Sequence, residues 1–322
     1  MTAPPLAVVL GRCDEMRAEV FFRVTLPGAA AAPQLAGTLV GPHCRRATTL
    51  PAVARVTDLG PARPASAATD VDAAVGRAIV TEPAYWTPDL PAVYRLDLKV
   101  VHGADVRRID GVVIGLRRFG VRRRSLWLDG RRWVPRGVAC TAAECDVAAL
   151  REAASTAVLR APDEAALAAA DAAGVAVIAL LDRVDDAAAE RIACWALHPA
   201  VMLAVLPGAA TAAEVTALAA AVGNAKGTLL LAQSVAGAAP PPPALALADG
   251  LDCLVVSLDR GCLPHDGWRG PPPVPLLAWR QADVPCGERR RACDVLQAEL
   301  AAWGLGGGAA HLAWDWAGYV VG

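Results

Sequence analysis

Hydrophobic positions in the first third of the chain recur in short runs that favour β-strands. Residues 18–26 mix β-branched and aromatic side chains, and Pro27-Gly28 ends the run. Further runs of this kind lie at residues 34–40, 52–57, 77–82, 92–101 and 106–116. An amphipathic pattern of three helical turns is not found before about residue 145. Short strands at this spacing predict a β-sandwich.

The pattern changes after Gly137, where short apolar runs alternate with helical segments. Strands are expected at residues 133–138, 157–159, 175–181, 201–206, 228–232, 251–258, 275–279 and 309–314. Helices are expected at residues 146–154, 163–173, 185–197, 211–222 and 288–303. Apolar strands that alternate with helices are typical of a parallel sheet, and eight of them predict a compact (β/α)8 TIM barrel. Glycine and prolines in residues 260–273 replace the sixth helix.

The length of 322 residues fits two domains. We place a β-sandwich at residues 1–122 and the barrel at residues 123–322. The net charge of −1 gives no reason to expect nucleic acid as a partner, and no apolar run reaches the roughly 18–20 residues of a membrane span. Nine cysteines without framework spacing favour reduced thiols, and the N-terminus has no positive leader, so a cytoplasmic location is expected.

Several segments, taken in order, resemble one enzyme family. The segment 82–94 contains Tyr-Trp-Thr-Pro-Asp-Leu-Pro, and it is followed by Gly-Leu-Arg at 115–117. The segment 126–138 combines a predicted Asp-Gly hairpin turn with Arg-Gly-Val. His-Pro-Ala-Val at 198–201 and Trp-Asp at 314–315 complete the series. Over roughly residues 80–322 the chain resembles glycoside hydrolase family 2, which implies an immunoglobulin-like sandwich joined to a TIM barrel.

The resemblance also implies two catalytic glutamates, at the ends of the fourth and seventh barrel strands. This chain has Gly208-Ala209 at the first position, and Trp279 or Arg280 at the second. A retaining glycosidase needs two carboxylates about 5 Å apart. The sequence therefore predicts a glycoside-hydrolase-like pseudoenzyme, with no catalytic residues expected, that binds carbohydrate or serves as an interaction or assembly module.

Two other functions stay open from the sequence. Aspartates at predicted strand ends could act as relocated carboxylates in an active hydrolase, with Asp182 and Asp259 as the pair and Asp315 nearby. Against this, aspartates next to arginines often cap loops or form ion pairs. Alternatively, the protein is purely structural and oligomeric, with Arg280 and tryptophans filling the barrel mouth.

The barrel mouth is expected to hold ligand-binding aromatic residues, because aromatic faces stack on the C–H faces of sugar rings. These candidates are Trp268, Trp279, Trp314 and Trp316, together with His311. Expected partners are a carbohydrate, a protein or a second copy of the chain, and neither nucleic acid nor membrane.

No cofactor and no metal are predicted. Cys262 and His265 lack further ligands at zinc-site spacing, and Cys140 and Cys145 do not form a C-x-x-C pair.

Overall fold

The computed structural model describes residues 6–27, 33–61, 71–141, 143–243, 247–306 and 314–322. The chain divides into two compact units. Unit 1 comprises Met1–Arg118, Ala193–Pro199 and Asn224–Thr228. Unit 2 comprises Phe119–Ile192, Ala200–Gly223 and Leu229–Gly322.

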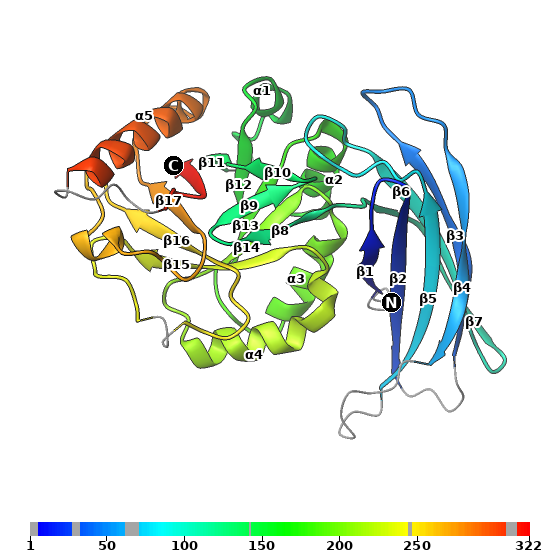
Figure 1. Ribbon diagram of the computed structural model, residues 1–322. Helices are drawn as coiled ribbons and strands as arrows, with labels where there is room; N and C mark the ends of the chain where they lie inside the picture. Colours follow the sequence, from blue (N-terminus) through cyan, green and yellow to red (C-terminus); the bar gives the residue numbers. More distant parts are fainter. Residues whose placement is uncertain (1–5, 28–32, 62–70, 142, 244–246, 307–313) are drawn as a thin grey trace. The chain divides into compact units, whose positions relative to one another are not determined.

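Unit 1 contains a curled antiparallel sheet of seven strands in the order β1-β2-β5-β4-β3-β6-β7 (Figure 1). The strands are β1 (Leu6–Cys13), β2 (Arg17–Pro27), β3 (Gln34–His43), β4 (Ala52–Pro61), β5 (Val71–Thr81), β6 (Val93–His102) and β7 (Asp105–Ile114). The sequence predicted β2 to β7 but not β1, whose apolar run is interrupted by Gly11-Arg12. β4 pairs with both β3 and β5, so hydrogen bonds join the two halves of the sheet.

The core of unit 1 lies against one face of the sheet, and every second strand residue points into it. Tyr94, Leu96 and Leu98 of β6 are buried, whereas the intervening Arg95 is exposed. The segment between β5 and β6 adds Tyr85 to this core, and the neighbouring Trp86 is completely buried. The residues that carry the family resemblance at 82–94 therefore belong partly to this core.

Unit 2 contains a closed barrel of eight parallel strands. The strands are β11 (Arg136–Cys140), β12 (Thr156–Arg160), β13 (Val177–Leu180), β14 (Val201–Leu206), β15 (Leu230–Ala236), β16 (Cys253–Leu258), β17 (Leu276–Arg280) and β18 (Gly318–Val321). β18 pairs with both β11 and β17 and so closes the barrel. A Cβ on Gly137 of β11 would lie 2.7 Å from a methyl carbon of Val320, so close packing requires glycine there. The predicted barrel is confirmed.

Helices pack around the barrel strands (Figure 1). They are α1 (Val147–Glu152), α2 (Glu164–Ala173), α3 (Ala188–Leu197), α4 (Ala212–Val222) and α5 (Cys286–Leu305). Asp146 and Asp163 cap α1 and α2 by accepting backbone N–H bonds, as their positions predicted. In the described part of the chain no α-helix lies between β15 and β17, and the region predicted to lack a helix holds the short 3-10 helix Asp266–Arg269.

None of the helices in the described segments is both long enough and apolar enough to cross a membrane.

The last barrel strand differs from its prediction. It was expected at residues 309–314, but β18 spans Gly318–Val321, and residues 309–313 lie outside the described part of the chain. Trp314 and Asp315 precede β18. Since the strands are parallel, these residues lie near the amino end of the barrel and not at its mouth.

A small three-stranded sheet precedes the barrel. It consists of β8 (Phe119–Arg122), β9 (Ser125–Leu128) and β10 (Arg131–Trp133). Asp129 and Gly130 connect β9 and β10 with φ values of 48° and 78°. Positive φ at both central residues is the feature of a type I′ hairpin turn, which the Asp-Gly pair predicted.

Candidate functional site

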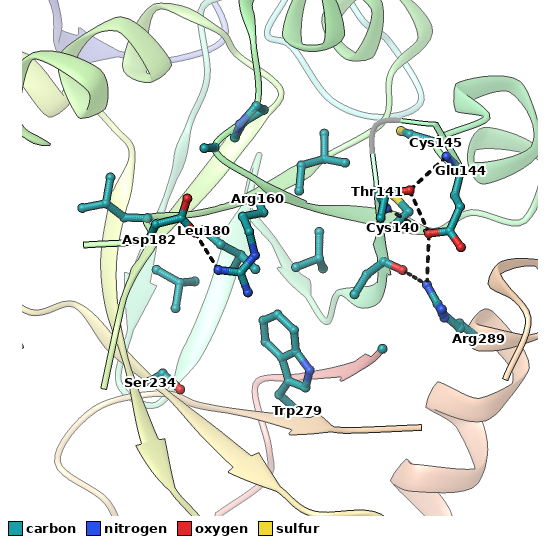
Figure 2. A pocket seen from close by; sticks show the side chains of 18 of the residues that line it. Cys140, Thr141, Glu144, Cys145, Arg160, Leu180, Asp182, Ser234, Trp279 and Arg289 are labelled. Carbon is teal, nitrogen blue, oxygen red and sulfur yellow. Dashed lines mark hydrogen bonds and ion pairs between the residues drawn. The ribbon is translucent and has the colours of Figure 1, made fainter. Parts of the chain in front are cut away.

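The carboxyl ends of the barrel strands surround a pocket of about 1210 Å³. TIM-barrel enzymes keep their active sites at this end of the barrel. The polar and aromatic side chains that line the pocket include Thr141, Glu144, Arg160, Asp182, Ser234, Ser257, Trp279 and Arg289 (Figure 2). This pocket is therefore the candidate site of unit 2.

The end of β17 presents a tryptophan to the pocket. Trp279 is half-buried and points into the pocket (Figure 2). Arg280, the next residue, is buried, forms an ion pair with Glu299 of α5 and donates to the Cys262 carbonyl at 2.9 Å. Successive strand residues point to opposite faces, so Trp279 faces the site and Arg280 faces the helix layer.

The segment after β14 presents a glycine to the pocket. Gly208 lines the pocket, and a Cβ at this position would lie 2.8 Å from the Ser234 carbonyl oxygen. A side chain at position 208 therefore requires the backbone to shift. Ala209 is exposed and is not one of the pocket-lining residues. Neither residue supplies a carboxylate.

Among the described residues, four acidic ones line the pocket, namely Glu144, Asp163, Asp182 and Asp283. Glu144 accepts hydrogen bonds from the backbone N–H and the hydroxyl of Thr141, at 3.0 and 3.1 Å. These bonds stabilise the charged form and hold the pKa of Glu144 below its ordinary value. A general acid at neutral pH needs a raised pKa, so Glu144 is shifted in the wrong direction for proton donation.

The other three acids are engaged in local contacts. Asp163 caps α2 through the Ala166 N–H at 2.8 Å. Asp182 pairs with Arg160 at 2.6 Å, an interaction that Figure 2 shows across neighbouring strands. Asp283 pairs with Arg260 at 2.5 Å.

The aspartates proposed from the sequence as relocated carboxylates do not gather in the pocket. Asp182 lines it, but Asp259 is exposed and is not part of its lining. Asp315 pairs with Arg132 at 3.0 Å.

Three of the four candidate tryptophans lie elsewhere than expected. Trp268, Trp314 and Trp316 are buried in a cluster formed by β16, β17, β18 and α5. The Trp314 and Trp316 rings lie 5.1 Å apart, and the Trp268 indole N–H donates to the Ala239 carbonyl at 2.8 Å. The prediction that they line the barrel mouth is corrected, because they fill the core behind the strands. His311 lies outside the described residues.

Sequence reasoning missed two arginines that the structure brings to the pocket. Arg160 is the last residue of β12. It stands two residues after Val158, so both side chains point to the same face of the strand, and both residues line the pocket. Arg289 of α5 donates to the Ala139 carbonyl and lies 3.9 Å from Glu144. The alternation of β12 is the signal that could have located Arg160. The hydroxyl pair Ser234 and Ser257, 2.9 Å apart, was also missed.

Within the described ranges, no group of three or more His, Cys, Asp or Glu side chains is arranged to hold a metal ion.

Solved structures with a similar fold include β-glucuronidases and a putative β-galactosidase. A β-glucuronidase of Bacteroides uniformis matches with a TM-score of 0.61 and 14% identity, over 98% of this chain and 45% of its own. A putative β-galactosidase of Bacteroides fragilis matches with a TM-score of 0.61 and 13% identity, over 88% and 47%. A β-D-glucuronidase of Dictyoglomus thermophilum matches with a TM-score of 0.61 and 12% identity, over 98% and 61%.

By sequence, no family model matches the chain, and no curated protein matches it. The chain spans about half the length of the first of these solved structures. At such low identity the likeness concerns the fold. The chain has a glycoside-hydrolase-like fold, shared with β-glucuronidases and a putative β-galactosidase.

Proposed function

We propose that this protein is a glycoside-hydrolase-like pseudoenzyme whose barrel binds carbohydrate without hydrolysing it. The observation that carries the proposal is the pair of residues at the ends of β14 and β17. Gly208, two residues after β14, and Trp279 of β17 both line the pocket. Neither has an ionisable group.

The loss of hydrolysis follows from the chemistry of a retaining glycosidase. One carboxylate attacks the anomeric carbon, and a protonated carboxyl group about 5 Å away donates a proton to the leaving oxygen. A positioned acid or base alone contributes about 10²–10⁴-fold in rate. Asp182 is held by Arg160, and Glu144 has a lowered pKa. Glu144 is therefore a poor proton donor, and Asp182 is already engaged with an arginine.

Sugar binding is supported by the combination of groups that remains. Trp279 offers an aromatic face, on which the apolar C–H face of a sugar ring can stack. The Arg160–Asp182 pair and the Ser234 and Ser257 hydroxyls offer donors and acceptors for sugar hydroxyls. A pocket with one apolar platform and a few polar groups suits a small polar ligand with an apolar face.

The proposal extends to the fold of unit 1, which we infer to be immunoglobulin-like. Strands β1-β2-β5-β4 follow one another in the sheet, and β3-β6-β7 follow in turn. This order corresponds to the ABED and CFG strands of an immunoglobulin constant-type domain.

The alternative of a hydrolase with relocated carboxylates is less well supported. It needs two acids in the pocket on either side of a glycosidic bond. Its second proposed acid, Asp259, is not among the pocket-lining residues.

Binding of sugars to the wild-type protein and to Trp279→Ala tests the proposal. At a sugar concentration 100 times the dissociation constant, the wild-type protein gains about 2.7 kcal/mol of stability and its melting temperature rises. The variant Trp279→Ala loses an aromatic contact with the sugar worth about 1.5–3 kcal/mol. It is therefore expected to bind the same sugar roughly ten- to a hundredfold more weakly. Calorimetric titration with neutral hexoses, N-acetylhexosamines and uronic acids measures both values.

Trp127→Ala is the matched control, because Trp127 is a half-buried tryptophan of β9 that is not part of the pocket lining. It is expected to bind sugar as the wild-type protein does. Equal affinity of wild type and Trp279→Ala would contradict binding of the sugar at Trp279. No saturable binding of any sugar would contradict the proposal and favour a purely structural role.

A further inference from the structure

Three cysteines gather at one side of the pocket. Cys140 ends β11, Cys145 precedes α1, and Cys286 begins α5. Cys140 and Cys145 both line the pocket. The Cys286 sulfur lies 4.0 Å from the carbonyl oxygen of Glu144, the residue next to Cys145. The sugar-binding proposal assigns no role to these thiols.

Local hydrogen bonds bring the segments that carry Cys140 and Cys145 together. The Glu144 N–H donates to the Thr141 carbonyl at 3.1 Å, and the Thr141 N–H donates to the Glu144 carboxylate at 3.0 Å. These bonds hold Thr141 and Glu144 close to each other, so the cysteines on either side of them lie near each other. Both cysteines line the pocket, and Figure 2 shows the two residues beside Thr141 and Glu144.

The proximity of the two thiols makes them chemically different. Interaction with the Cys140 side chain lowers the pKa of Cys145 to about 7. The same interaction, together with burial, raises the pKa of Cys140. The thiolate is the reactive form of cysteine. At neutral pH the pair therefore combines a reactive sulfur at Cys145 with a neighbouring thiol at Cys140.

We propose that Cys140 and Cys145 form a redox-active dithiol at the pocket, which a hydroperoxide oxidises to an intramolecular disulfide. The Cys145 thiolate attacks the peroxide oxygen, so an S–O bond forms, the O–O bond breaks and hydroxide leaves. The Cys140 sulfur then attacks this sulfenic acid, an S–S bond forms, and the oxygen departs as a second hydroxide. The two thiol protons convert both hydroxides to water. Two thiols are oxidised by two electrons and one hydrogen peroxide is reduced.

The surroundings favour this pair over other described cysteines. Burial raises the pKa of Cys293 to about 12, so that thiol is unreactive at neutral pH. Burial also raises the pKa of Cys286. The proposal is independent of sugar binding, but the disulfide would lock one wall of the same pocket.

Peptide mapping after oxidation tests the proposal directly. Cleavage after arginine places Cys140 and Cys145 in one peptide, residues 137–151, and Cys286 in another, residues 281–289. The protein is treated with one equivalent of hydrogen peroxide, and its remaining thiols are then alkylated. The expected result is that peptide 137–151 resists alkylation at both cysteines, lacks two hydrogens, and regains both thiols after treatment with a dithiol reductant.

Two variants and one internal control sharpen the outcome. In Cys145→Ser, Cys140 is expected to stay fully alkylatable, and in Cys286→Ser the 137–151 disulfide is expected to form as in the wild type. Exposed Cys262 is the internal control, because it lies outside the pocket lining and is expected to remain a free thiol. Full alkylation of peptide 137–151 in the oxidised wild type, or a cross-link between peptides 137–151 and 281–289, would overturn the proposal.

Discussion

Trp86→Ala is expected to destabilise unit 1 by about 3–5 kcal/mol, the usual cost of truncating a buried tryptophan. Trp86 is completely buried, and its backbone N–H donates to the Leu116 carbonyl at 2.6 Å. A Cβ on Gly115 would lie 3.3 Å from the Trp86 Cβ and 2.3 Å from that of Pro199, so the packing around this residue is tight. Surrounding side chains therefore have little freedom to fill the cavity that alanine leaves.

Urea unfolding followed by circular dichroism measures this loss, and hydrogen exchange of peptides from β6 attributes it to unit 1. Trp86→Phe is the matched control, because it keeps an aromatic ring and leaves a smaller cavity. It is expected to cost clearly less than Trp86→Ala. A change below about 1 kcal/mol for Trp86→Ala would mean that the site repacks or that this tryptophan does not contribute to the core.

Asp171→Ala is expected to destabilise unit 2 by about 2–3 kcal/mol, because it removes a buried hydrogen bond to a charged group. Asp171 of α2 is 4% exposed, and its carboxylate accepts from the Ala200 N–H at 2.8 Å. Ala200 immediately precedes β14, the strand that leads to Gly208 in the pocket. Alanine leaves that buried N–H without this acceptor.

Asp171→Asn separates the hydrogen bond from the charge, since the amide oxygen can still accept from Ala200. It is expected to retain more stability than Asp171→Ala. The measurements are the urea midpoint and the hydrogen exchange of peptides covering β14, which should exchange faster in Asp171→Ala. Equal stabilities of wild type and Asp171→Ala would show that the Asp171 contact contributes nothing to this strand.

Most barrel strands could be predicted from the sequence because they are apolar on both faces and lie between capped helices. β14, with Val201–Leu206 buried throughout, is an example. The last strand could not be placed in the same way. Four buried residues, Gly318–Val321, form a weak signal, and the Trp-Asp pair at 314–315 suggested a position too early in the chain. Pairing with β11 and β17 determines this strand, and such pairing is not visible in local sequence.

The site was predictable only in part. The sequence located most strand ends around the pocket, but it left two residues, Trp279 and Arg280, for one position. The alternation of β17 and the ion pair of Arg280 with Glu299 decide between them. The tryptophans near β18 were misplaced because an aromatic residue in a loop gives no local sign of burial. Contacts such as Arg160 with Asp182 depend on neighbouring strands and appear only in three dimensions.

Hydrolysis of a broad panel of aryl glycosides tests most directly whether the barrel lacks glycosidase chemistry. With long incubation and protein purified free of host glycosidases, we expect no aglycone release above the buffer control for any α- or β-glycoside. Asp182→Ala removes an acid that lines the pocket. It is the control that distinguishes hydrolysis by this protein from hydrolysis by a contaminating glycosidase. Reproducible release from one glycoside that disappears in Asp182→Ala would contradict the proposal and show that a relocated carboxylate performs the chemistry.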